Sequence, residues 1–114
     1  MEEYMNKKIE IYVRLEENGE EKILKLQAEP VDDNTAIYNI KNVSTLNKDN
    51  EVQWFVVDIA SGDSIVSDRY KQKALYKYNN KYKTIYDKYR EEEEYKFHKK
   101  LFESKVRKAK KEWR

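Results

Sequence analysis

Neither glycine nor proline occurs after Gly62, so the last fifty-two residues lack the residue types that most often end a helix. The spacing of apolar residues changes near the same point, from strict alternation to a period of about 3.6 residues. The sequence therefore predicts an acidic β domain over residues 1–67 and a basic helical arm, rich in Tyr and Lys, over residues 68–114. Ser67 or Asp68 can cap the first helix of the arm.

The first two strands can be aligned on paper. Apolar residues alternate with polar ones before an Asn-Gly pair, the residue pair that favours a two-residue hairpin turn. If Glu17 faces Glu20 across that turn, paired positions sum to 37 and the apolar residues of both strands share one face. These residues are Ile9, Ile11, Val13, Leu24, Leu26 and Ala28.

Three further strands are expected. The turn "EPVDDN" leads to a strand near residues 35–40, and the polar loop "STLNKDNE" precedes "VQWFVVDIA". The apolar residues of "VQWFVVDIA" fall on both faces, which indicates a central strand covered on both sides. "SGDSIV" then gives a turn and a short last strand. We expect an α+β fold: a small antiparallel sheet of four to five strands, able to curl towards a barrel, followed by a long C-terminal amphipathic helix or helical arm.

The arm carries two apolar stripes. On a helical wheel with 100° per residue, the first covers an arc of about 120° and the second about 140°. The first stripe consists of Ala74, Leu75, Tyr78, Tyr82, Ile85, Tyr86 and Tyr89, with Arg90 away from it. The second consists of Tyr95, His98, Leu101, Phe102, Val106, Ala109 and Trp113. Only Tyr70 and Tyr76 lie outside the first stripe, and these are the tyrosines that we consider for base stacking.

The two stripes point to nearly opposite sides of an unbroken helix, because twenty residues separate their origins. Either the helix breaks near "REEEE", or it continues and its ends pack against different surfaces. Glutamate is a good helix former, so nothing local forces a break, and we expect one long helix, straight or bent. Its second stripe would then lack a partner within the chain. Leu101, Phe102, Val106 and Trp113 are accordingly predicted to form an interface with a protein partner or a second copy.

A basic flank accompanies the second stripe. Its members are Lys96, Lys99, Lys100, Arg107, Lys110, Lys111 and Arg114. Residues 1–67 carry seven Lys or Arg against fourteen Asp or Glu, whereas residues 68–114 carry seventeen against eight. This asymmetry favours an acidic partner for the arm, such as nucleic acid, or the packing of the two halves on one another.

Catalytic and metal-binding patterns are sparse. The chain has no cysteine and only two glycines, which excludes thiolate chemistry and glycine-rich phosphate loops. The only histidine, His98, follows Glu94 by one helical turn, which fits helix packing better than a metal site. Asp58, Asp63 and Asp68 could converge on Mg²⁺ for nuclease chemistry. Their alternative roles are a strand end, a turn and a helix cap, so we expect no metal site, no cofactor, no small-molecule substrate and no enzymatic activity.

The sequence favours a non-enzymatic binding protein that acts through its helical arm on a macromolecular partner. Small phage or mobile-element proteins that regulate or inhibit nucleic-acid machinery have this kind of charge pattern. The alternative is direct, sequence-tolerant nucleic-acid binding by the basic flank. No apolar run is long enough to span a membrane, and the start "MEEYMNKK" lacks the apolar core of a signal peptide, so we expect a cytoplasmic location.

Overall fold

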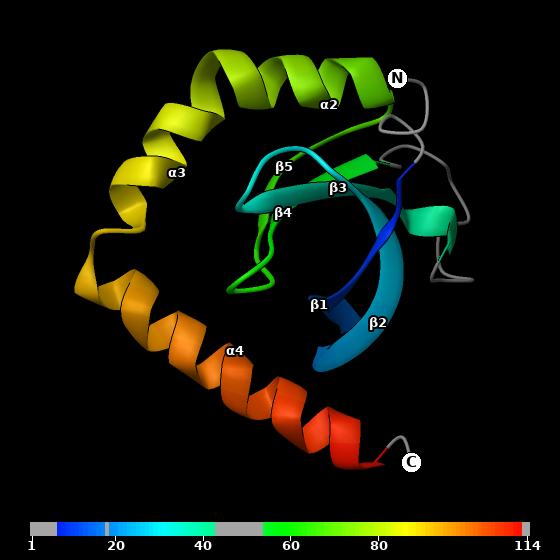
Figure 1. Ribbon diagram of the computed structural model, residues 1–114, viewed down its shortest axis with the longest axis vertical. Helices are drawn as coiled ribbons and strands as arrows, with labels where there is room; N and C mark the ends of the chain where they lie inside the picture. Colours follow the sequence, from blue (N-terminus) through cyan, green and yellow to red (C-terminus); the bar gives the residue numbers. More distant parts are fainter. Residues whose placement is uncertain (1–6, 18, 43–53, 113–114) are drawn as a thin grey trace.

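The computed structural model describes residues 7–17, 19–42 and 54–112, and it confirms the α+β fold (Figure 1). An antiparallel sheet of five strands has the order β1-β2-β3-β4-β5. The strands are β1 (Ile9–Glu17), β2 (Glu20–Pro30), β3 (Thr35–Asn39), β4 (Trp54–Asp58) and β5 (Ser64–Asp68), with a 3₁₀ turn η1 (Ile40–Asn42) after β3. The sheet is curled but not closed into a barrel. The predicted loop at residues 44–51 lies outside the described residues.

The predicted hairpin register is confirmed. Ile9 pairs with Ala28, Ile11 with Leu26 and Val13 with Leu24. Gly19 has a φ of +81°, the left-handed conformation that such a turn requires and that glycine adopts without strain. Turn geometry and side-chain alternation therefore agree on a single register.

The curled sheet packs apolar side chains on both of its faces. On the concave side, the hairpin residues pack against Ala36, Tyr38 and Val57 of β3 and β4. On the other side, Ile37, Val56 and Val66 pack against Ala74 and Tyr78 of the helical arm. The strand β4 contributes to both clusters, as expected for a strand covered on both sides.

The helical arm is not one long helix. It consists of α2 (Lys71–Lys77), the π-helix η2 (Tyr78–Tyr82), α3 (Lys83–Tyr89) and α4 (Glu93–Glu112), with a turn at residues 90–92 before α4. Figure 1 shows α2, α3 and α4 as an arc around the sheet. The first helix begins at Lys71, because Asp68 still belongs to β5, where it accepts a hydrogen bond from the Tyr70 N–H.

The π-helix changes which residues of α3 face the sheet. It inserts one extra residue into a turn, which rotates every later residue by roughly 100° on the wheel. Ile85, predicted on the inner stripe, is therefore 52% exposed, whereas Arg90, predicted off the stripe, reaches the sheet. The sequence wheel assumed a uniform 3.6-residue period and could not anticipate this rotation.

The second stripe packs against the β domain of the same chain, so the expectation that it lacks an intramolecular partner is wrong. Tyr95, Phe102 and Ala109 are buried along the inner side of α4. Phe102 lies against Gly62 in the β4–β5 turn so closely that a Cβ on Gly62 would overlap its ring. The turn at residues 90–92 brings this stripe back to the sheet.

Gly62 and Gly19 provide a matched test of this close contact. Both have positive φ, but no atom lies within 4 Å of a Cβ placed on Gly19. Gly19→Ala should lower the free energy of unfolding by about 1 kcal/mol through backbone strain alone. Gly62→Ala should cost about 2–4 kcal/mol, because it adds overlap with the buried Phe102 ring. Urea denaturation measures both, and equal losses would contradict the packing of α4 on this turn.

Candidate functional site

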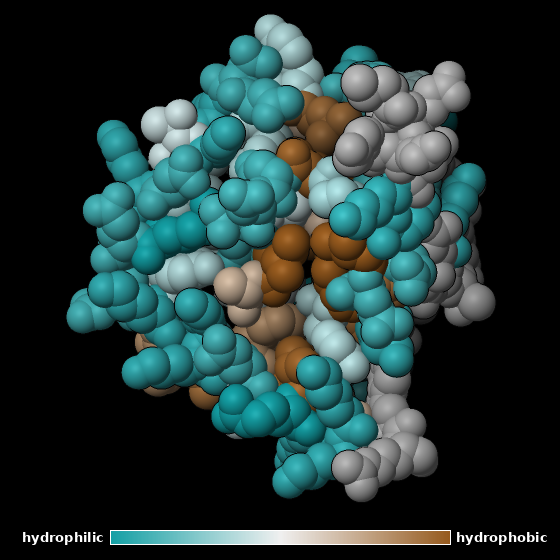
Figure 2. Space-filling model, viewed as in Figure 1, coloured by the Kyte–Doolittle hydropathy of each residue, from teal (hydrophilic) through white to brown (hydrophobic). Residues whose placement is uncertain are grey.

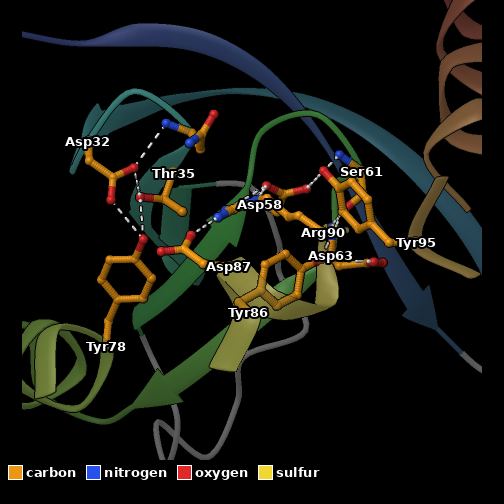
Figure 3. A network of polar contacts seen from close by, with 11 residues as sticks. Asp32, Thr35, Asp58, Ser61, Asp63, Tyr78, Tyr86, Asp87, Arg90 and Tyr95 are labelled. Carbon is orange, nitrogen blue, oxygen red and sulfur yellow. Dashed lines mark hydrogen bonds and ion pairs between the residues drawn. The ribbon is translucent and has the colours of Figure 1, made fainter. Parts of the chain in front are cut away.

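A network of polar contacts centred on Asp58 connects the sheet to the helical arm (Figure 3). Asp58 ends β4 and is only 1% exposed. Its Oδ1 accepts hydrogen bonds from Nε and Nη2 of Arg90 at 3.1 and 2.9 Å. Its Oδ2 accepts the Tyr95 hydroxyl at 2.7 Å and the Ser61 N–H at 3.1 Å. The Asp58 carboxylate thus bonds to one residue before α4, Arg90, and to one residue within α4, Tyr95.

The surroundings raise the pKa values of three members of this network, Arg90, Tyr95 and Tyr86. Burial favours a lower pKa for Arg90, but its hydrogen bonds and attraction to Asp58 outweigh that effect and raise the pKa. Burial raises the pKa of the Tyr95 hydroxyl, and donation to Asp58 raises it further. Burial likewise raises the pKa of Tyr86, which lies 3.2 Å from Ser61 Oγ. None of these shifts moves a group towards neutral pH, so the network fits a structural role better than acid–base catalysis.

A second hydrogen bond between a tyrosine hydroxyl and a carboxylate joins η2 to the turn between β2 and β3. The Tyr78 hydroxyl donates to Asp32 Oδ2 at 2.7 Å, and Thr35 donates to Asp32 Oδ1 at 2.6 Å. Burial would raise the pKa of Asp32, but these two bonds and the Asn34 N–H lower it overall. Tyrosine hydroxyls on the inner side of the arm therefore bind carboxylates of the β domain.

The three candidate metal-binding aspartates are not brought together. Asp58 pairs with Arg90, Asp63 with Arg14, and Asp68 with Lys77 at 2.7 Å. Within the described ranges, no group of three or more His, Cys, Asp or Glu side chains could hold a metal ion. Nε2 of His98 lies 3.8 Å from a Glu94 carboxylate oxygen, on the half-exposed side of α4.

A groove lies between β1, the start of the β4–β5 turn and α4, and we call it the seam groove. Its volume is about 660 Å³. Figure 2 shows a strip of apolar side chains in a hollow between the helical arm and the sheet. The groove is lined by Glu10, Ile11, Tyr12, Ile59, Ala60, Phe102, Glu103, Val106, Arg107 and Lys110. It lies where the curled sheet fails to close, and α4 forms one wall.

The structure separates the residues predicted to bind a partner. Phe102 and Val106 line the seam groove, although Phe102 is 4% exposed and packs on Gly62. Leu101 is 41% exposed on the outer side of α4, next to the 61% exposed Phe97 one turn before it. Trp113 lies outside the described residues.

The predicted basic flank is on the surface of α4. In the described part of the chain, Lys99, Lys100, Arg107 and Lys111 have no ion-pair partner. Lys96 lies 3.8 Å from Glu93, and the Lys110 ammonium lies 5.5 Å from the centre of the Tyr12 ring. Arg114 lies outside the described residues.

The sequence did not predict the contacts that the edge of β1 and Arg90 make. Arg14 contacts Glu21 and Asp63 and donates its N–H to the Gly62 carbonyl at 3.4 Å, which joins β1 to the β4–β5 turn. A lone arginine in an alternating strand gives no sequence signal for such a contact.

The predicted stacking residues Tyr70 and Tyr76 are both exposed, and Lys73 lies over the Tyr70 ring.

Comparison with protein-family models, curated proteins and solved structures gave no match. Over the described residues, no helix combines the length and the apolar composition that crossing a membrane requires.

The Asp58–Arg90 pair predicts a large cost for removing one partner. Arg90→Met keeps much of the side-chain volume but leaves Asp58 buried without its cation, and we expect a loss of about 3–5 kcal/mol in unfolding free energy. Lys88→Met, at an exposed position of α3, is the control and should cost less than about 0.5 kcal/mol. Urea denaturation measures the unfolding free energy of both variants. Equal losses would show that the Asp58–Arg90 pair does not stabilise the packing of the helical arm on the sheet.

Proposed function

We propose that this is a non-enzymatic binding protein that engages a protein partner through its helical arm, with the seam groove as the docking surface. The observation that carries this proposal is the groove itself. It has a volume of about 660 Å³, and apolar side chains from β1, the β4–β5 turn and α4 contribute to its lining. Two of the four arm residues predicted to bind a partner, Phe102 and Val106, lie in it.

The chemistry of the groove supports binding and not turnover. Its apolar lining residues include Ile11, Ile59 and Val106, and its charged lining residues are Glu10, Glu103, Arg107 and Lys110. Arg90 and Tyr95 both bond to the buried Asp58, and none of the three residues lines the groove. A concave apolar surface with a charged rim is the usual composition of a protein-binding site. Regulation or inhibition of nucleic-acid machinery, with a partner from that machinery, would suit the basic surface beside the groove.

Blocking the groove tests this function. Val106→Trp fills the groove from α4, and Ser104→Trp adds the same side chain at an exposed position that is not part of it. Immobilised wild-type protein and the Ser104→Trp variant should capture the same protein from a native-source extract. The Val106→Trp variant should capture at least about tenfold less of that protein, because two or more methylene-sized contacts with it are lost. Thermal unfolding of both variants checks that they fold.

Quantitative mass spectrometry of the captured proteins decides the outcome. If Val106→Trp folds and captures the same proteins in the same amounts as Ser104→Trp, the groove is not the docking surface. A protein captured equally by all three forms would point to a different face of the molecule.

Direct nucleic-acid binding is the second candidate, and the unpaired cations of α4 favour it. Residues 95–111 contain eight Lys or Arg and one Glu. Lys99, Lys100, Arg107 and Lys111 have no carboxylate partner within the described ranges, so their charge is free to neutralise phosphates. Lysine outnumbers arginine among them, which fits contact with the backbone and not base recognition.

Salt dependence tests this second candidate. Four phosphate contacts at roughly 0.9 each predict a slope of about −4 for log K against log salt. Fluorescence anisotropy with a labelled 20-base-pair duplex should then show a drop of about 100-fold or more between 50 and 200 mM salt. Lys100→Glu/Lys111→Glu should reduce affinity, whereas Lys41→Glu/Lys7→Glu, a matched change on the β domain, should not. Absence of binding at 50 mM salt rejects this candidate.

A further inference from the structure

The seam groove runs beside main-chain groups of β1 that point away from the sheet. In an antiparallel strand, the N–H and C=O of one residue point to the same side, and successive residues alternate. The Arg14 N–H bonds to Gly62 and not to β2, so Arg14 points to the free edge. Tyr12 and Glu10 share its parity and therefore point to the same edge.

This edge is closed at one end and open at the other. At Arg14 it meets the β4–β5 turn through the 3.4 Å bond to Gly62. At Tyr12 and Glu10 the seam groove separates it from Ile59 and Ala60. Across the described residues, the N–H groups of Tyr12 and Glu10 have no backbone partner outside the strand. The open end of the seam thus exposes an unpaired strand edge beside an apolar groove.

An unpaired edge of this kind selects an extended ligand. A helix satisfies its own main chain and would leave the edge groups of Glu10 and Tyr12 unpaired, whereas a strand can bond to both. The two residues are about 6.7 Å apart along the strand, which matches the two-residue repeat of an extended peptide. The apolar side chains of Ile59 and Val106 would then contact alternate side chains of that peptide.

The charges on the rim define the ligand further. Glu10 lies 3.7 Å from the Lys25 ammonium, so its charge is partly compensated. Two carboxylates, Glu10 and Glu103, and two cations, Arg107 and Lys110, line the groove. Because Lys25 adds a third cation beside Glu10, the cations at the rim outnumber the carboxylates, and Arg107 has no ion-pair partner in the part that the structure describes. The uncompensated charge of the rim is therefore positive.

We propose that the seam groove receives an extended segment of a partner protein, which adds a strand to the free edge of β1 by bonding to Glu10 and Tyr12. The segment has apolar residues at alternate positions and an acidic residue opposite Arg107 and Lys110. This inference rests on the proposed function and specifies how the partner docks. It also accounts for the incomplete closure of the sheet, because the bound segment occupies the gap.

Peptide selection followed by backbone methylation tests the mode of docking. A display library of random ten-residue peptides is selected on the wild-type protein and depleted on Val106→Trp. Selected peptides should alternate apolar and polar residues and contain Asp or Glu. Each is then synthesised in two forms, N-methylated at odd or at even positions, which keeps every side chain but removes alternate N–H donors.

One methylated form should lose binding by about 10–100-fold, because two hydrogen bonds to β1 are lost, and the other should stay within about threefold of the parent. Amide exchange at Glu10 and Tyr12 should slow at least tenfold in the complex, with no change at Gly19. Strand addition is wrong if both methylated forms bind like the parent peptide, or if the amides of Glu10 and Tyr12 are not protected from exchange in the complex. Either result still allows the peptide to dock in the groove by another mode.

The remaining outcomes are also decisive. A library that yields no peptide dependent on Val106 overturns the inference. If the amides of Glu10 and Tyr12 are already protected in the free protein, sedimentation distinguishes a second copy, which gives a dimer, from a segment of the same chain, which gives a monomer. Either result rejects a partner strand at this edge, and neither affects the capture experiment that tests the proposed function.

Discussion

The ion pair between the buried Asp58 and the partly buried Arg90 is the interaction on which the arrangement of the helical arm depends. Asp58 is fixed at the end of β4, and its two carboxylate oxygens bind Arg90 and Tyr95, which stand on either side of the turn between α3 and α4. Removal of a charge from water is costly unless partners replace the lost hydration, so this carboxylate strongly favours the conformation that brings both partners to it. The chain turns there although its glutamates are good helix formers. Tertiary contact overrides local helix propensity at this point.

The position of α4 follows from that turn and determines the candidate site. Because the chain turns at residues 90–92, Tyr95, Phe102 and Ala109 pack on the β domain, and α4 becomes a wall beside β1. The sheet itself stops short of closing: Arg14 reaches Gly62, but within the described residues the N–H groups of Tyr12 and Glu10 have no backbone partner outside the strand. A gap in a curled sheet and a helix beside it together form the seam groove. The groove is thus a consequence of two separate packing events, and neither is visible in one segment of sequence.

The opposite charges of the two halves are partly used within the molecule. Lys71 pairs with Glu29, Arg90 with Asp58 and Lys105 with Glu21, each joining the arm to the β domain. On the described part of α4, Lys99, Lys100, Arg107 and Lys111 keep no ion-pair partner, and Arg107 lines the seam groove. The charge asymmetry therefore has two consequences: ion pairs join the two halves, and a cationic surface is left beside the groove.

The sequence by itself determined the hairpin register, the α+β class and the amphipathic stripes, because each depends on contacts between residues close along the chain. The Asn-Gly pair in the sequence favours a two-residue turn, and alternation then left one register for β1 and β2. Tertiary structure alone decided the turn before α4, the rotation that exposes Ile85 and directs Arg90 inward, and the burial of Phe102 on Gly62. These features depend on a π-helix and on a carboxylate thirty-two residues from its cation. A helical wheel with one fixed period contains no information about either.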